Sequence, residues 1–270
     1  MNMLWNAKNG CVNIGNTDMD YVSFGHGSKV LVLLPGLSDG LVTVKEKALL
    51  LAKPYRTFFK NYTVYMFSRK NKMQEGYSIR DMAADQASAL KNLGITKASV
   101  MGVSQGGMIA QYFAIDHSDM IEKLVIAVSA PKVNDVIRGC VEKWIKIAEQ
   151  GDHKSLMIDI AEKSYSEGYL KNYRKLYPIL GNLGKPDSYN RFFINANAIL
   201  NFDAYGELDK ITCPTFIIGG GVDKTVGINA SYEMKDKIKD SELYVYKDLG
   251  HAAYEEAKDF NSRIYNFLIK

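Results

Sequence analysis

Short, continuous runs of apolar residues recur in the first half of the chain and again near its end. They include VLVLL at 30–34, VYMF at 64–67, SVMGV at 99–103 and LVIAV at 124–128. Runs of this length are typical of strands that are buried on both faces of a parallel sheet. Before them, CVNIG and DYVSFG, bounded by turn residues, predict two short antiparallel strands. TFIIGG at 215–220 and ELYVYKD at 242–248 predict two more strands near the end.

Helical patterns alternate with these strands. The clearest follows Ser78, after which apolar residues recur at helical spacing until Gly94. Ser78 and Asp81 form an acidic variant of the capping box, which marks a helix start. Further helices are predicted at 106–115, at 229–238 and at the C-terminus. This alternation of strand and helix predicts a mostly parallel sheet with helices on both faces.

The alternation stops between residues 131 and 210. About eighty residues are too many for a structureless loop in a compact domain, and they suggest several helices, for example over 135–151 and 154–177. An insertion that follows a strand of an open α/β sheet emerges at the carboxyl end of that strand, where such sheets bind ligands. The chain is therefore expected to consist of a core, 1–130 and 211–270, and a helical cap, 131–210.

Composition narrows the class of protein. The 270 residues are 47% hydrophobic and 24% charged, which fits a globular domain with a sizeable core. The net charge of +4 is too small, and the basic residues too scattered, to predict binding to nucleic acid or a membrane. The start of the chain lacks a signal-peptide pattern, and no apolar run reaches the length of a membrane span. Three widely separated cysteines indicate reduced thiols. We expect a cytoplasmic protein with a small-molecule substrate; its oligomeric state is left open.

Ser104 stands between two glycines where a predicted strand meets a predicted helix. In the pattern G-x-S-x-G, the turn is so sharp that Gly102 and Gly106 must be small, which leaves the serine hydroxyl projecting above the sheet. The helix that follows directs its first N–H groups and the positive end of its dipole to the same place. Gly107 would let this helix pack closely on its neighbours. The junction therefore predicts an oxygen nucleophile beside groups that stabilise an anion.

A serine nucleophile needs a base and an acid. Of the four histidines, His251 is the candidate base, because it follows the last strand and so lies at the same sheet edge as Ser104. Asp223, after the strand at 215–220, is the favoured acid, and Asp135 is the alternative, because it follows another strand. The remaining histidines are His26 in an early turn, His117 at a helix end and His153 in the expected cap.

Four segments, LLPGLSDG, VMGVSQGG, GGGVDKTV and DLGHAAYEE, resemble the α/β-hydrolase superfamily in order and approximate spacing. The resemblance covers nearly the whole chain. It implies an α/β-hydrolase fold with about eight strands and a helical cap. It also implies a triad of Ser104, Asp223 and His251, with an oxyanion hole formed by the N–H groups of Leu37 and Gln105.

The chain departs from this superfamily in the loop that contains Leu37. Members commonly have His-Gly there, whereas this chain has Pro35-Gly36. Proline fixes its own φ and has no N–H, so how this loop is held stays open. A serine nucleophile, rather than an aspartate, speaks against haloalkane dehalogenase and epoxide hydrolase chemistry.

The expected reaction is a two-step acyl transfer that needs neither metal nor cofactor. A small or medium carboxylic ester is the favoured substrate class. Thioesters, amides, lactones, C–C bond hydrolysis, perhydrolysis and acyl transfer to an alcohol remain alternatives, as does a non-catalytic ligand-binding role.

Three features near the expected site have two interpretations each. Tyrosines recur every four residues, and packing of the cap on the core is favoured over a pocket wall; they are Tyr165, Tyr169, Tyr173 and Tyr177. The same interpretation is favoured for Trp144 and Met157. The charged segment that starts at Arg69 is expected to be a solvated loop rather than a clamp for an acidic substrate.

Overall fold

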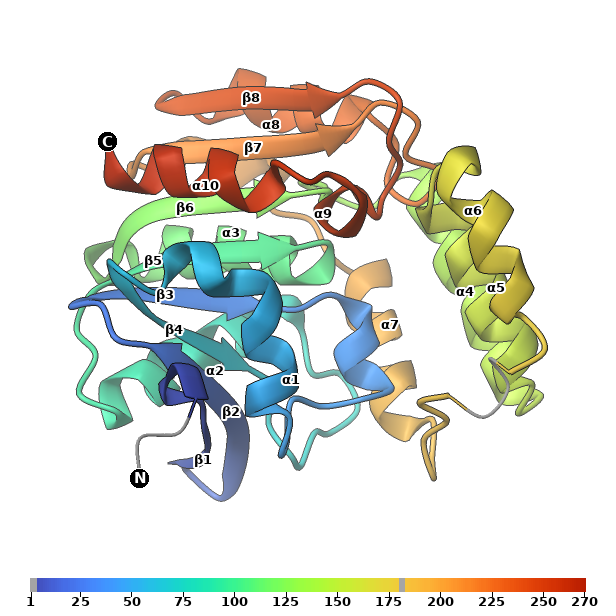
Figure 1. The fold of residues 1–270 in the computed structure, drawn as a ribbon, viewed down its shortest axis with the longest axis horizontal. Helices are drawn as coiled ribbons and strands as arrows, with labels where there is room; N and C mark the ends of the chain where they lie inside the picture. The colour runs from blue at the N-terminus through green and yellow to red at the C-terminus, as the bar shows by residue number, and fades with distance from the viewer. Residues whose placement is uncertain (1–3, 180–182) are drawn as a thin grey trace.

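The computed structural model describes residues 4–179 and 183–270, within which eight strands form one sheet (Figure 1). The strands are β1 (Lys8–Ile14), β2 (Thr17–Gly25), β3 (Lys29–Leu34), β4 (Tyr62–Phe67), β5 (Ala98–Val103), β6 (Ile121–Ala127), β7 (Thr215–Gly220) and β8 (Ser241–Tyr246). Their order in space is β1-β2-β4-β3-β5-β6-β7-β8. β2 runs antiparallel to both β1 and β4, and every other neighbouring pair is parallel. The expected mostly parallel sheet is confirmed.

The described residues also form α-helices and short 3-10 turns. The helices are α1 (Ala48–Ala52), α2 (Ile79–Asn92), α3 (Gln105–Asp116), α4 (Asp135–Glu149), α5 (His153–Ser164), α6 (Glu167–Tyr173), α7 (Asn190–Leu200), α8 (Asn229–Lys237), α9 (Ala253–Glu256) and α10 (Phe260–Ile269). The 3-10 turns are η1 (Leu4–Asn6), η2 (Leu37–Gly40), η3 (Lys53–Phe58), η4 (Ser118–Met120), η5 (Arg174–Leu176) and η7 (Tyr205–Lys210). Within the described ranges, none of the helices has the length and apolar character that crossing a membrane requires.

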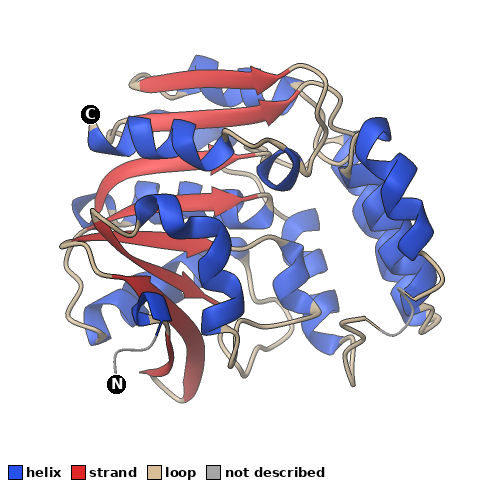
Figure 2. Cartoon of the chain, viewed as in Figure 1, coloured by secondary structure: helices blue, strands red, loops and turns tan. Residues whose placement is uncertain are grey.

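Both faces of the sheet are covered, which explains why the central strands are apolar throughout (Figure 2). Side chains of β3 alternate between two core clusters. Leu31 and Leu33 pack into the cluster that also contains residues of α1 and α10. Val32 and Leu34 pack into the other, which contains residues of α2, α3 and α8. The prediction of helices on both faces is therefore confirmed.

The predicted start and end of α2 are also confirmed. The Ser78 hydroxyl accepts a hydrogen bond from the Asp81 N–H, and the Asp81 carboxylate accepts one from the Ser78 N–H. This reciprocal pair satisfies two N–H groups that the first helical turn leaves free. At the other end, Gly94 has a φ of 72°, a left-handed conformation that glycine adopts without strain.

In the described part of the segment between β6 and β7, the α-helices are α4 to α7, and they lie beyond the arrowheads of the parallel strands (Figure 1). The single helix expected over 154–177 is wrong, because α5 ends at Ser164 and α6 begins at Glu167. Tyr165 between them is extended, and the Ser166 hydroxyl caps α6 by accepting from the Tyr169 N–H. Serine favours this cap position over a helix interior, which accounts for the break.

Candidate active site

Ser104 occupies the tight turn between β5 and α3, with φ 54° and ψ −121°, a conformation rare for a residue other than glycine. A Cβ atom on Gly102 would lie 2.2 Å from the carbonyl oxygen of Gly106, and one on Gly106 would lie 1.9 Å from that of Leu34. A Cβ atom on Gly107 would lie 2.6 Å from the Ser129 Cβ of the neighbouring segment. The predicted need for small residues at Gly102 and Gly106 and the predicted close packing at Gly107 are thus confirmed.

The structure brings Ser104, His251 and Asp223 together. His251 Nε2 lies 2.9 Å from Ser104 Oγ, and His251 Nδ1 lies 2.8 Å from Asp223 Oδ2. The serine follows β5, the aspartate follows β7 and the histidine follows β8, so the carboxyl edge of the sheet supplies all three. With its proton on Nδ1, the imidazole donates to Asp223 and accepts from Ser104. A base held in this way can take the hydroxyl proton as the oxygen attacks.

The Asp223 carboxylate is buried, but protein groups donate hydrogen bonds to both of its oxygens. Its side chain is 1% exposed, and its Oδ1 accepts hydrogen bonds from the N–H groups of Thr225 at 2.7 Å and Val226 at 2.9 Å. Burial by itself raises the pKa of Asp223, but the charge and hydrogen bond of His251 and the two N–H groups outweigh it and hold the pKa below its usual value. The Asp223 carboxyl group is therefore ionised at neutral pH, where it can stabilise the imidazolium of His251.

The other candidate groups lie elsewhere. Asp135, the alternative acid, is the exposed first residue of α4. His26 is exposed, His117 follows the C-terminal end of α3, and His153 is buried in α5, where it contacts the Tyr189 hydroxyl. Within residues 4–179 and 183–270, no three His, Cys, Asp or Glu side chains are grouped so that they could hold a metal ion.

Leu37 and Gln105, the expected oxyanion-hole residues, flank the nucleophile. Leu37 is the first residue of η2 and Gln105 the first of α3, positions whose N–H groups have no acceptor within their own helix. The loop before Leu37 lies against the nucleophile, since a Cβ atom on Gly36 would lie 3.3 Å from Ser104 Cβ and 3.8 Å from Ser104 Oγ. Leu37 also lines the same cavity as Ser104, so the assignment of both N–H groups to an oxyanion hole stays a prediction.

A cavity of about 130 Å³ opens onto Ser104 and His251. Its lining is mostly aliphatic and aromatic, and much of it comes from α4, α5 and α7; these helices contribute Ile137, Val141, Trp144, Met157, Ile160, Ser164, Phe192 and Ile199. Trp144 and Met157 are therefore part of a pocket wall, and the packing interpretation favoured for them is incomplete. The apolar positions of α4 and α7 were visible in the sequence, but their inward direction was not.

The tyrosines of the stripe pack mainly on one another, and the favoured packing on the core holds for Tyr165, whereas Tyr169 is exposed. The Tyr165 and Tyr169 rings stack with centroids 4.5 Å apart, and Tyr173 lies 5.1 Å from Tyr165 and 6.3 Å from Tyr177. The Tyr165 hydroxyl donates to Glu255 of α9, which joins α5 to the core. None of these four side chains is among the residues that line the cavity.

The expected solvated loop holds for residues 71–76, which are exposed apart from the half-buried Met73, but the expectation is wrong for Arg69. Its side chain is fully buried, and its guanidinium Nη2 donates to the Pro35 carbonyl at 2.6 Å and to Gln105 Oε1 at 3.0 Å. Arg69 lies two residues after β4, so it is at the same sheet edge as the nucleophile. Its position after β4 was the one feature of the sequence that could have indicated a role at the site. The charged residues around it favoured the interpretation as a solvated loop instead.

Comparisons with known proteins agree with this architecture. The family model described as "alpha/beta hydrolase fold" matches residues 29–258. A 2-hydroxy-6-oxononadienedioate/2-hydroxy-6-oxononatrienedioate hydrolase from a Pseudomonas species is 27% identical, over 91% of this chain and 90% of its own.

Two solved structures share the fold. MGS-M2, an alpha/beta hydrolase enzyme from a Medee basin deep-sea metagenome library, superposes with a TM-score of 0.83 at 21% identity, over 97% of this chain and 98% of its own. The enol-lactonase from Burkholderia xenovorans LB400 superposes with a TM-score of 0.79 at 19% identity, over 97% of this chain and all of its own. At these identities the two structures are evidence for the fold alone. Together with the family match, the sheet order and the turn at Ser104, they show that the chain belongs to the alpha/beta hydrolase fold family.

Proposed function

We propose that this chain is a serine hydrolase that cleaves small or medium, uncharged carboxylic esters through an acyl-enzyme on Ser104. The observation that carries the proposal is the pair of hydrogen bonds that His251 makes, to Ser104 Oγ at 2.9 Å and to Asp223 Oδ2 at 2.8 Å. A serine hydroxyl is a weak nucleophile by itself, and this arrangement supplies the base and the group that orients the base.

In the first step, Ser104 Oγ attacks the ester carbonyl carbon while its proton passes to His251 Nε2. The carbonyl oxygen becomes an oxyanion, which the N–H groups of Leu37 and Gln105 stabilise. Asp223 stabilises the imidazolium that forms. Collapse of the tetrahedral intermediate breaks the bond to the leaving alkoxide, which takes the proton from His251 and departs as an alcohol.

In the second step, water attacks the acyl-enzyme. His251 accepts a proton from the water as its oxygen adds to the carbonyl carbon, and the same two N–H groups stabilise the second oxyanion. Collapse of this intermediate returns the proton to Ser104 Oγ and releases the carboxylic acid. The atoms balance with water as the only co-reactant.

The lining of the cavity supports an uncharged, apolar acyl group. A dry cavity of about 150 Å³ holds one benzene molecule, so the volume here fits an acyl group of similar size. The described lining residues include no lysine or arginine to pair with a carboxylate. The Pseudomonas relative is named for a dicarboxylate substrate. We therefore favour an ester of a monocarboxylic acid, with residues 131–210 acting as the cap that shapes its pocket.

Labelling with a fluorophosphonate and hydrolysis of p-nitrophenyl esters of graded acyl length test the proposal. Wild type should label once and prefer short to medium acyl chains, and Ser104→Ala should lose both labelling and about 10⁶-fold in kcat. Ser231→Ala, which removes another buried hydroxyl on α8, is the matched control and should label like wild type. Folded wild type that neither labels nor hydrolyses any ester would favour a ligand-binding role instead.

We also place this enzyme in the cytoplasm. Cys11, Cys140 and Cys213 are free thiols in the structure, which suits a reducing compartment.

A further inference from the structure

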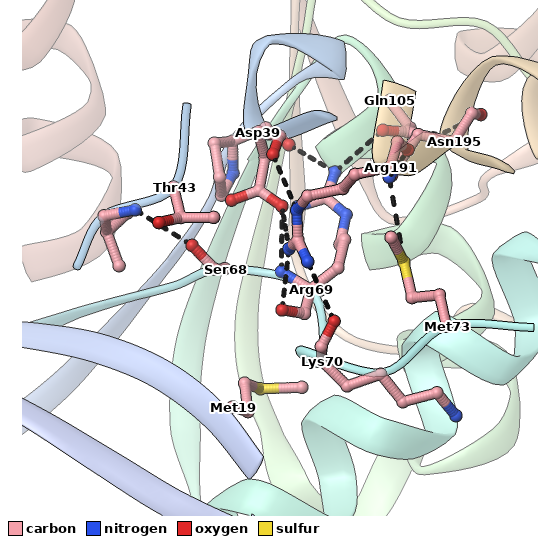
Figure 3. A network of polar contacts seen from close by, with 12 residues as sticks. Met19, Asp39, Thr43, Ser68, Arg69, Lys70, Met73, Gln105, Arg191 and Asn195 are labelled. Carbon is pink, nitrogen blue, oxygen red and sulfur yellow. Dashed lines mark hydrogen bonds and ion pairs between the residues drawn. The ribbon is translucent and has the colours of Figure 1, made fainter. Parts of the chain in front are cut away.

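A network of buried polar side chains joins η2, the segment after β4, the start of α3 and α7 (Figure 3). At its centre is Arg69, whose guanidinium Nη2 donates to two acceptors, the Pro35 carbonyl and Gln105 Oε1. Each acceptor is close in sequence to one proposed oxyanion donor. Pro35 precedes Leu37 by two residues, and Gln105 itself carries the other N–H group. One nitrogen atom therefore bridges the two segments that form the oxyanion hole.

We propose that Arg69 is a positioning residue, which fixes the Leu37 and Gln105 N–H groups relative to each other. The inference rests on the proposed function, because it assigns those two groups to the oxyanion. Donors aimed at a developing oxyanion stabilise it only if they are already in place, and a displacement of about 1 Å can cost about 10²-fold in rate. A charge-assisted hydrogen bond at each segment is well suited to prevent such a displacement.

Pro35 makes this support necessary. Proline has no N–H, so its only backbone polar group is the carbonyl, and at this position the carbonyl accepts from Arg69. The loop also lies directly on the start of α3, because a Cβ atom on Gly106 would lie 1.9 Å from the Leu34 oxygen and 2.8 Å from the Pro35 oxygen. The segment is thus in close contact with α3, and its Pro35 carbonyl accepts a hydrogen bond from Arg69.

The buried charge of Arg69 is partly offset by Asp39, which belongs to η2, the same short turn that begins with Leu37. Burial lowers the pKa of Arg69, and the neighbouring Asp39 carboxylate opposes this effect. Asp39 Oδ2 accepts from the backbone N–H of Arg69 at 2.9 Å and forms an ion pair with Arg191 Nη2 at 2.7 Å. The backbone of Arg69 is thus tied to η2, and Asp39 links it to Arg191 of α7.

The Gln105 carboxamide is held from both sides. Its oxygen accepts from Arg69, and its Nε2 donates to the Asn195 carbonyl of α7 at 2.8 Å. Asn195 in turn donates to the Arg191 carbonyl at 2.8 Å. The residue after the nucleophile is therefore attached to both the 34–39 loop and α7, which leaves its N–H little freedom to rotate away from the oxyanion.

Two substitutions at Arg69 test this role in the full-length protein. Arg69→Met keeps much of the volume and removes the donors, so kcat for p-nitrophenyl butyrate should fall about 10- to 100-fold while KM stays within about twofold. Inhibition by butylboronic acid, which forms a tetrahedral adduct with a serine, should weaken by the same factor. Arg69→Lys keeps a charged donor and should recover part of both losses. A merely structural role would not move kcat and the boronate inhibition constant together.

Arg80→Met is the matched control. Arg80 is a half-exposed arginine that joins α2 to Asp116 and Glu207, away from the cavity, so its loss should lower the unfolding temperature without lowering kcat. If both Arg69 variants fail to fold, Gln105→Met leaves Arg69 in place and removes its second acceptor together with the hydrogen bond to the Asn195 carbonyl; it should lower kcat about 10-fold.

The two failures can be told apart. A wild type that is not labelled by a fluorophosphonate contradicts the proposed function. A labelled, active wild type with a folded Arg69→Met variant whose kcat is unchanged, or whose loss is confined to KM, contradicts the positioning role alone. If folded Gln105→Met, examined in place of unfolded Arg69 variants, keeps its kcat, the positioning role is contradicted as well.

Discussion

At the scale of single residues, the proposed chemistry depends on how one imidazole is held. His251 contacts Ser104 through one ring nitrogen and Asp223 through the other, and both of its partners are fixed by tight turns after strands. Asp223 also orders the turn in which it lies, because its carboxylate accepts hydrogen bonds from the Thr225 and Val226 N–H groups.

Replacement of the acid should be severe and specific. Asp223→Asn keeps the shape of the side chain but favours the wrong tautomer of His251, so kcat should fall about 10⁴-fold while the protein remains folded. Asp135→Asn, at the exposed start of α4, is the control and should keep wild-type kcat. Steady-state kinetics with circular dichroism checks both, and a larger loss in Asp135→Asn would show that the acid is misassigned.

The lowered pKa of Asp223 makes a prediction about pH. A carboxyl group with a lowered pKa stays ionised at every pH above the ordinary value of about 3.9, whereas protonation of His251 removes the base. As pH falls, log kcat/KM should therefore decline through a single ionisation. A decline that fits only two cooperative protonations above pH 5 would mean that Asp223 titrates as well.

At the scale of elements, the proposed nucleophile, base and acid follow strand ends, and the helices between β6 and β7 supply most of the apolar wall of the cavity. Neighbouring residues of α5 show the division. Met157 lines the cavity, while Leu156 is fully buried and is not among the lining residues. One side of the helix is thus placed to affect substrate choice and the other to affect stability.

Shortening one wall residue should change acyl-length preference. Met157→Ala enlarges the cavity, so kcat/KM for p-nitrophenyl octanoate should rise relative to the butyrate by about tenfold, which corresponds to about 1.4 kcal/mol of apolar contact. Leu156→Ala is the matched control: it should cost about 2–5 kcal/mol in the free energy of unfolding and leave the preference unchanged. Equal shifts in both variants would contradict the assigned wall.

Sequence patterns predicted elements well where a single physical signal determined the structure. Gly102 and Gly106 constrain the turn sterically, and chain order after successive strands singled out Asp223 and His251, so these residues could be named in advance. Arg69 could not be named in advance, because a charged residue beside other charged residues predicts exposure to solvent. Its burial depends on Asp39 and Arg191, which are 30 and 122 residues away in the chain. Likewise, the break at Tyr165 depends on a serine cap that competes with an otherwise helical pattern.

At the scale of the whole molecule, the fold brings distant segments to one edge of one sheet. Ser104 and His251 are 147 residues apart in sequence, and the parallel order of β5, β6, β7 and β8 makes them neighbours. The proposed oxyanion donors are backbone N–H groups of this chain, and the proposed base is one of its side chains. The proposed reaction therefore needs no metal ion or cofactor.

This independence can be measured. Dialysis against EDTA should leave both the esterase activity and the unfolding temperature unchanged, since every step uses only Ser104, His251, Asp223 and two N–H groups. Assays before and after dialysis, with and without added divalent metals, check it. Activity lost on dialysis and restored by a metal would contradict the proposed mechanism.

The most direct measurement is mass spectrometry of acid-quenched wild-type protein during turnover of p-nitrophenyl butyrate. The account predicts a burst of p-nitrophenol together with one butyryl group on the peptide that contains Ser104, absent from Ser104→Ala. Undiminished hydrolysis by Ser104→Ala, or a butyryl group carried on another residue, would contradict it.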